Sequence, residues 1–178
     1  MKICIDAGHG GKDPGAVSEG TQEKDINLQI AKKLYEILEK NNYQLLMTRL
    51  EDNYISLEER TNMANDFDAD IFISIHNNAV FNPDVQGTET LYYPGSEKGE
   101  RLAKLVQDEL VKKLQRPDRG IKPRGKLAVL KYTVMPAILV ECAFLTNPTE
   151  RKLLQDSEFQ ELIAEATTEG IGHYFEEV

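Results

Sequence analysis

Three strand-like runs of this chain end on residue types that bind a metal ion or work beside one. His9 follows the first run in a glycine-rich loop, His76 ends the second run, and Glu141 ends the third. In open α/β sheets, ligands bind outside the carboxyl ends of the strands, where residues far apart in sequence converge. Two imidazoles and a carboxylate at such an edge favour a metal-dependent hydrolase.

The chemistry of such a site needs two acidic side chains. Zinc in a hydrolytic site takes three protein ligands and leaves one position for water, whose pKa it lowers to about 7. A further carboxylate acts as general base, taking the proton of the water and passing it to the leaving amine. Glu141 is a candidate for one acidic role, and Glu19, Glu23 and Asp25 are candidates for the other. Spacing alone does not choose among these three, although Glu23 is preferred because it stands where a helix begins.

Each of these residues also has a structural interpretation. His9 could instead be a solvated loop residue, and His76 could be a buried histidine whose hydrogen bonds are satisfied within the fold. Glu141 is harder to explain in this way, because an acid after an apolar run is costly to bury without a partner. His173 lies in the last helical segment among glutamates, and we expect it on the surface.

The elements that position these residues alternate between strands and helices. This order predicts a three-layer α/β/α domain with a twisted, mostly parallel (mixed) sheet of about six strands flanked by helices. We expect strands at 2–6, 43–47, 70–76, 88–93, 127–130 and 136–141, with the strand at 88–93 more exposed than the others. We expect helices at 23–41, 56–67, 96–114, 148–155 and 157–176, and a loop at 115–126. Ser56 and Glu59 have the spacing of a capping box.

Composition limits the class of protein. The 178 residues fit a single domain, 1–178, and 40% hydrophobic with 29% charged residues is an ordinary globular balance. A net charge of -9 argues against a nucleic-acid partner. No apolar run is long enough to predict a membrane span. Cys4 and Cys142 lie in apolar runs, so we expect buried free thiols, with a disulfide possible only if the two strands are neighbours.

An ordered series of motifs covers essentially the whole chain. The series comprises DAGHGG at 6–11, Glu23 with Asn27-Leu28, Thr48-Arg49, SLEER at 56–60, Ala64-Asn65, SIHNNA at 74–79, Gly87-Thr88-Glu89, DRGIK at 118–122, MPAILVE at 135–141 and FLTN at 144–147. Taken in order, these motifs resemble the zinc-dependent N-acetylmuramoyl-L-alanine amidases of the family 3 catalytic-domain type.

The resemblance implies a role for each acidic candidate. It implies one zinc ion per chain, held by the positions of His9, Glu23 and His76, with Glu141 as the catalytic acid/base. The implied reaction is hydrolysis of the amide between the lactyl group of N-acetylmuramic acid and L-alanine of the stem peptide. The stretch between Phe81 and Gly87 is too short for the autoinhibitory helix of some relatives, which predicts an open site.

Further polar residues are candidates for substrate contacts or for the scaffold. Asn77 and Asn78 follow a metal-ligand position and are candidates for hydrogen bonds to the stem peptide, or for turn formation. Arg119 is a candidate for a peptide carboxylate, or for a solvated loop residue. We expect Arg49 and Arg60 to pair with carboxylates within the fold.

The resemblance also implies partners and a place of action. The partner is peptidoglycan or muropeptides, and we expect a monomer. Because an acidic domain is repelled by an anionic wall, we expect targeting by a separate wall-binding module. No signal peptide is visible, since Met1-Lys2 runs directly into the first strand. We therefore expect action where the protein is made, release by lysis, or a place at the cell wall as part of a longer exported chain.

Two other functions compete with this one. A zinc peptidase or deacetylase would keep the metal but cut a different bond. A glycan- or peptide-binding module would have lost catalysis, although binding alone does not need a strand-end acid opposite a metal.

Overall fold

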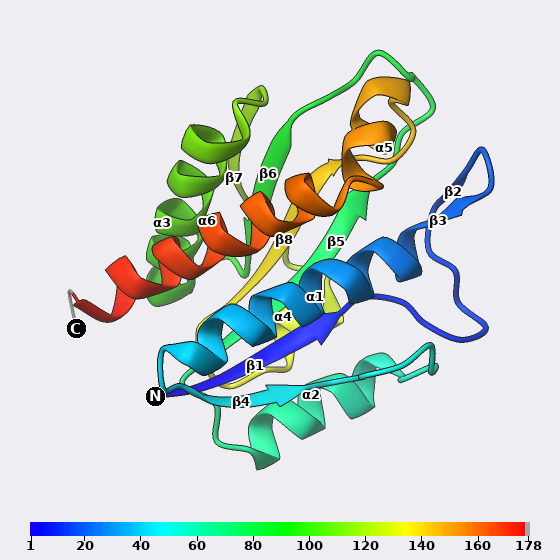
Figure 1. The fold of residues 1–178 in the computed structure, drawn as a ribbon. Helices are drawn as coiled ribbons and strands as arrows, with labels where there is room; N and C mark the ends of the chain where they lie inside the picture. The colour runs from blue at the N-terminus through cyan, green and yellow to red at the C-terminus, as the bar shows by residue number, and fades with distance from the viewer. Residues whose placement is uncertain (177–178) are drawn as a thin grey trace.

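The protein, described here by a computed structural model of residues 1–176, is built on one six-stranded sheet. The strand order is β4-β1-β5-β8-β6-β7. The strands span Lys2–Ala7 (β1), Gln44–Met47 (β4), Ile71–Asn78 (β5), Thr88–Tyr92 (β6), Asp118–Pro123 (β7) and Ala137–Phe144 (β8). The first four in this order run parallel, whereas β6 is antiparallel to β8 and parallel to β7. The predicted mixed, mostly parallel sheet is confirmed, and the carboxyl ends of β1, β5 and β8 lie at the same end (Figure 1).

Helices cover both faces of the sheet. They span Glu23–Lys40 (α1), Leu57–Asp66 (α2), Glu97–Leu114 (α3), Ala128–Lys131 (α4), Pro148–Leu154 (α5) and Ser157–Glu176 (α6). In Figure 1, α1 and α6 cross in front of the sheet. The buried side chains of α1, α3 and α6 form one apolar cluster with the sheet, and those of α2 and α4 form a second cluster. The three-layer α/β/α architecture is therefore confirmed.

Strand alternation decides which face each functional residue occupies. In β5, Ile71, Ile73 and Ile75 pack in the cluster of α1, α3 and α6, whereas Phe72 packs in the cluster of α2 and α4. Successive side chains of a strand point to opposite faces, so His76 lies on the same face as Phe72. The chemically important residues of the sheet therefore belong to the side that the two short helices cover.

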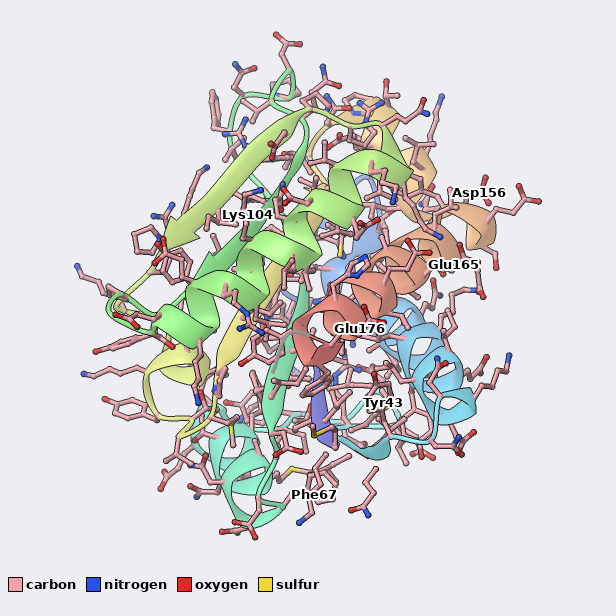
Figure 2. The ribbon with its side chains drawn as sticks, turned by 90° about the vertical axis from the view of Figure 1, so that its left-hand side faces the viewer. Tyr43, Phe67, Lys104, Asp156, Glu165 and Glu176 are labelled. Carbon is pink, nitrogen blue, oxygen red and sulfur yellow. The ribbon has the colours of Figure 1, made fainter. Side chains whose placement is uncertain are left out.

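The opposite face is closed by α3 and α6, which pack against each other. Figure 2 looks onto α3, with α6 beside it and with Lys104 and Glu165 labelled on the two helices. A Cβ atom at Gly170 of α6 would lie 2.5 Å from the Cα of Val106 in α3, so glycine allows the two backbones to approach. Lys113 of α3 bridges to Glu165 at 2.8 Å and joins the helices at their exposed edge.

Three expectations about the second half of the chain were wrong. The predicted loop at 115–126 contains β7, whose backbone pairs with β6 although its sequence is polar, because an edge strand needs little apolar surface. The predicted strand at 127–130 is largely helix α4, since a short apolar run has no period that separates the two structures. The strand predicted at 88–93 is buried over Thr88–Tyr92 rather than exposed, because β6 lies between β8 and β7 and α3 packs against it.

Other local expectations were confirmed. Ser56 and Glu59 form the capping box of α2. Cys4 and Cys142 are buried and free. A short hairpin, Val17–Ser18 (β2) with Thr21–Gln22 (β3), precedes α1 and was not foreseen. Among residues 1–176, no helix combines the length and the apolar composition that crossing a membrane requires.

Candidate metal centre and active site

The first histidine is delivered by a tight loop after β1. The amide of Gly8 donates a hydrogen bond to the carbonyl of Ile75 at 3.1 Å, so the loop continues along β5. A Cβ atom at Gly8 would lie 2.2 Å from Nε2 of His76. His9 itself has a φ of 62°, a left-handed conformation that is uncommon outside glycine. The loop thus brings the two imidazoles together at the cost of backbone strain.

Arg60 of α2 fixes this loop through hydrogen bonds to its backbone and to Asp6. It is 3% exposed, and its Nη1 atom donates to Oδ1 of Asp6 at 2.6 Å and to the carbonyl of Ala7 at 2.7 Å. Its Nη2 atom donates to the carbonyl of His9 at 2.6 Å. The expected pairing of Arg60 with a carboxylate is confirmed, and the same side chain fixes the strained backbone of the histidine.

Arg49 supports the same loop in a different way. Its Nε atom donates to the carbonyl of Ala7 at 2.9 Å, and its Nη2 atom donates to the carbonyls of Gly8 at 3.0 Å and Lys24 at 2.7 Å. The expectation of a carboxylate partner for Arg49 was wrong, because the loop turns its carbonyl oxygens inward and these need donors.

Three side chains converge above the loop. Glu23, the first residue of α1, places Oε2 at 3.1 Å from Nε2 of His9 and Oε1 at 2.9 Å from Nδ1 of His76. One ligand atom from each residue lies within 4.8 Å of the others. The two rings meet edge to face with centroids 4.9 Å apart. Of the three candidates at the start of α1, the structure brings Glu23 into this cluster.

A second layer of hydrogen bonds orients the three side chains. Nδ1 of His9 lies 2.8 Å from Oδ2 of Asp13, so a carboxylate faces the ring nitrogen that is turned away from Glu23. Glu23 accepts hydrogen bonds from Ala16 N at 2.9 Å and from Asn27 Nδ2 at 3.2 Å. Carboxylate–histidine contacts of this kind fix the ring orientation in metal sites. Sequence reasoning missed Asp13, and its spacing of four residues from His9 was the only signal.

The charges of the cluster stabilise one another. Burial opposes protonation of His9, but hydrogen bonds and the charges of Glu23 and Asp13 outweigh it and raise the pKa of His9 to about 9. Burial also opposes ionisation of Glu23, but hydrogen bonds from His76 and His9 hold its pKa well below the usual range. The site therefore stabilises an anionic Glu23 beside a protonated His9. A divalent cation would take the place of that proton, because metal ligation needs the neutral imidazole.

Glu141 completes the site from the neighbouring strand. It lies directly beside His76 in the β5–β8 register and opposite Glu89 in the β6–β8 register. Its Oε2 atom is buried and makes no hydrogen bond within residues 1–176. Burial, followed by the charges of Glu23 and Glu89, raises the pKa of Glu141 to about 7 against the opposing effect of the two histidines. A carboxyl with such a pKa both accepts and donates a proton near neutral pH.

Comparison with known proteins identifies the family. The N-acetylmuramoyl-L-alanine amidase family matches residues 3–173. The chain belongs to this family. Its members are peptidoglycan hydrolases, and the resemblance read from the motifs is thereby confirmed.

Relatives in bacteria agree over nearly the whole chain. The N-acetylmuramoyl-L-alanine amidase LytC of Bacillus subtilis is 38% identical over 97% of this chain, which corresponds to 35% of that longer protein. The crystal structure of an N-acetylmuramoyl-L-alanine amidase from Clostridium difficile 630 is 40% identical, has a TM-score of 0.95, and covers 98% of this chain and 96% of that one. The CwlD amidase of Clostridioides difficile, solved in complex with the GerS lipoprotein, is 35% identical with a TM-score of 0.97 and 99% coverage of both chains.

Asn77 and Asn78, two of the candidates for substrate contacts, differ in burial. Asn77 is 2% exposed, and its Nδ2 atom donates to Asn27 Oδ1 at 2.8 Å behind Glu23. Strand alternation turns Asn77 away from the face of His76, so its side chain supports Glu23 through Asn27 in this structure. Asn78 is partly exposed and donates to Glu89 Oε1 at 3.1 Å, at the edge of the site.

Glu89 is a site residue that sequence reasoning missed. It is 6% exposed beside Glu141, and its Oε2 atom accepts a hydrogen bond from Arg119 Nε at 3.2 Å and another from Lys122 Nζ. Arg119 also lies over the ring of Phe144, 5.0 Å from the centroid. The alternating pattern of β6 suggested an exposed acid, and only its register opposite Glu141 reveals the contact.

The surroundings leave the metal centre accessible. A cleft on the α2 side is lined by Gly8, His9, Asp13, Tyr54, Ile55, Leu57, Arg60, His76, Val129 and Asp6. No helix is present between Phe81 and Gly87, as the sequence predicted. His173 lies far along α6, its side chain is 50% exposed, and it stands 3.5 Å from Glu109, as expected for a surface residue.

Proposed function

We propose that this chain is a zinc-dependent N-acetylmuramoyl-L-alanine amidase that hydrolyses the amide between the lactyl group of N-acetylmuramic acid and L-alanine of the stem peptide. His9, Glu23 and His76 hold one zinc ion per chain, and Glu141 is the catalytic acid/base. The observation that carries the proposal is the convergence of three donor atoms within 4.8 Å beside a buried carboxylate oxygen that has no partner among the described residues.

The residues present fit a catalytic zinc ion. Two imidazoles and one carboxylate are a common ligand set for hydrolytic zinc, and they leave a coordination position open. Asp13 supplies the outer carboxylate that such a site uses to orient a histidine, 2.8 Å from Nδ1 of His9. When bound, the metal polarises the scissile carbonyl and makes water a better nucleophile near neutral pH.

Glu141 performs the proton transfers in this proposal. In its ionised form, Oε2 accepts a proton from the attacking water while the water oxygen bonds to the carbonyl carbon. The carbon–nitrogen bond then breaks, and Glu141 donates the same proton to the departing nitrogen of L-alanine. A pKa of about 7 suits both directions of transfer, and the missing internal partner leaves Oε2 available to the reactants.

We also propose that residues 1–178 act as one catalytic domain and as a monomer on peptidoglycan or muropeptides. The family match over residues 3–173 and the single sheet shared by both apolar clusters support this organisation. Because the chain carries a net charge of -9, we assign attachment to the anionic cell wall to a separate module or partner. Strong binding of this chain alone to purified sacculi would contradict that assignment.

Product analysis tests the reaction. Zinc-loaded wild type should release muropeptide stems with a free L-alanine amine and an unshortened peptide, measured by amine labelling and mass spectrometry. Glu141→Gln should release none. The matched control is Glu161→Gln, since the side chain of Glu161 is 45% exposed on α6, and it should match wild type. Shortened peptides would instead indicate a peptidase, free acetate a deacetylase, and intact substrate with bound metal a binding module.

A further inference from the structure

A second hollow adjoins the metal cleft, between α2 and α4. Six residues line this α2–α4 groove: Leu57, Glu58, Thr61, Asn62, Ala128 and Tyr132. Leu57 lines the metal cleft as well, and Val129 of α4 lines the cleft beside its neighbour in the groove. The groove therefore borders the metal cleft at Leu57, on the side from which a bound substrate could extend.

The groove has exposed apolar walls held in a fixed position. Leu57 and Tyr132 both line the groove and are each 58% exposed, so they offer apolar surface to an occupant. Asn65 of α2 donates to the carbonyl of Tyr132 at 3.0 Å and accepts from the amide of Val134 at 3.0 Å. These two hydrogen bonds tie the end of α4 to α2.

Charge distinguishes the two directions in which a substrate can leave the metal centre. On the side of β6 and β7, Arg119 and Lys122 both contact the carboxylate of Glu89. The side chains of Arg119 and Lys122 are 35% and 31% exposed and that of Glu89 is 7% exposed, so the charge that a substrate meets on this side is positive. The lining of the α2–α4 groove contains one charged residue, Glu58, and the ammonium of Lys131 lies 5.1 Å from the ring centroid of Tyr132, so charges of both signs border the groove. An anionic part of a substrate is thus favoured on the β7 side, and a neutral part is favoured in the groove.

We propose that the α2–α4 groove binds the uncharged N-acetylated sugars of the glycan strand, while the anionic stem peptide lies towards Arg119 and Lys122. This inference rests on the proposed amidase function, since the scissile amide joins these two parts of the substrate. Sugars present apolar C–H faces and polar edges, and an aromatic side chain with a few polar neighbours matches them. Tyr132 and Leu57 offer the apolar surface, and Thr61 and Asn62 offer polar groups.

The test compares substrates that share one stem peptide but carry glycans of increasing length. The series is the peptide on N-acetylmuramic acid alone, on a disaccharide and on a tetrasaccharide, each cleaved by zinc-loaded enzyme. Wild-type kcat/KM should rise with glycan length. Tyr132→Ala should lower kcat/KM on the tetrasaccharide by roughly three- to tenfold, the size of one aromatic contact, and lower it less on the monosaccharide substrate, so that the rise with glycan length is lost.

Two further variants sharpen the result. Leu162→Ala changes an exposed leucine on α6, at the opposite face of the sheet, and should match wild type on all three substrates. Arg119→Gln should lower kcat/KM by the same factor at every glycan length, because it acts on the peptide side. The side chain of Tyr132 is exposed and its hydrogen bond to Asn65 uses the backbone, so the alanine variant should keep the melting temperature of wild type.

Failure of this inference is distinct from failure of the proposed function. Wild type that cleaves none of the substrates would reject the amidase function itself. Wild type that cleaves all three, with Tyr132→Ala lowering every rate equally or none, would reject the glycan groove. A wild-type dimer in sedimentation that Tyr132→Ala dissociates would assign the groove to a second copy of the chain and also overturn the proposal.

Discussion

Removal of the guanidinium of Arg60 should destabilise the whole fold and not only the site. In an Arg60→Met variant, Asp6 stays 1% exposed and loses its ionic partner, keeping only hydrogen bonds from Thr48 Oγ1 at 2.6 Å and Ser74 Oγ at 2.7 Å. The carbonyl of His9 also loses the donor at 2.6 Å that holds its left-handed backbone. A buried charge and a buried acceptor are therefore both left uncompensated.

The expected loss follows from these contacts. Breaking a buried ion pair by removing one partner typically costs about 3–5 kcal/mol, so we expect about 4 kcal/mol of unfolding free energy. Since whole domains are stable by roughly 5–15 kcal/mol, this is a large fraction of the total. For a domain of this size, about 4 kcal/mol corresponds to a fall in melting temperature of roughly 8–16 °C.

Urea denaturation followed by circular dichroism, together with calorimetry, measures both quantities. Replacing the pair as a whole, in Asp6→Leu/Arg60→Met, should recover much of the loss, because no buried charge then remains. The matched control is Lys104→Ala, which breaks an exposed ion pair with Asp108 on α3 and should change stability little. A loss below about 1 kcal/mol for Arg60→Met would refute the reasoning that this pair holds the loop.

The same pair predicts a pH dependence of stability. Burial raises the pKa of Asp6, but the charge of Arg60 and hydrogen bonds from Thr48, Ser74 and Arg60 outweigh it and lower the pKa below its ordinary value. The folded pKa is thus lower than the unfolded value of about 3.9, so the pair contributes fully above that pH. Wild type should therefore lose stability relative to Asp6→Leu/Arg60→Met as pH falls below about 4. An unchanged difference from pH 7 to pH 3 would show that folding does not lower the pKa of Asp6.

Three further predictions concern the site. Asp13→Asn should weaken zinc affinity by roughly 10–100-fold with little change in melting temperature, because the carboxylate orients His9. Competition with a chelating dye measures the affinity, and an unchanged value would show that Asp13 does not support the metal site. Glu89→Gln should move the acidic limb of the pH profile of kcat/KM to lower pH, because a negative neighbour no longer raises the pKa of Glu141. A shift of this limb to higher pH would contradict the expected effect of Glu89 on that pKa. Gly8→Ala should abolish zinc binding in equilibrium dialysis, since the added Cβ would lie 2.2 Å from Nε2 of His76. Full zinc occupancy would mean that the loop backbone can shift to make room for this Cβ atom.

Much of the site could be predicted because strand ends are visible in the sequence. His76 and Glu141 each end an apolar run, and parallel strands in register necessarily bring such residues together. Glu23 could not be separated from Glu19 and Asp25 by spacing; its place at the start of a helix favoured it, and the resemblance to the family selected it. The distinction depends on how the loop and hairpin before α1 fold back, which no local pattern encodes.

The missed features depend on contacts between distant segments. Glu89 belongs to a strand that was expected to be more exposed than the others, but β7 covers the edge of that strand and supplies Arg119 and Lys122. That edge strand itself has a polar sequence and forms because β6 offers a free row of backbone groups. Arg49 was expected to seek a carboxylate, whereas the carbonyls of a strained loop needed its donors more.

Zinc content of purified variants tests the central claim most directly. Wild type and Glu141→Ala should each bind about one zinc ion per chain, whereas His9→Ala, Glu23→Ala and His76→Ala should bind little or none, measured by elemental analysis after dialysis against trace zinc. Retention of the metal in Glu141→Ala, together with loss of amidase activity, is the result that the account predicts. Loss of zinc in Glu141→Ala, or full zinc occupancy in the three ligand variants, would contradict it.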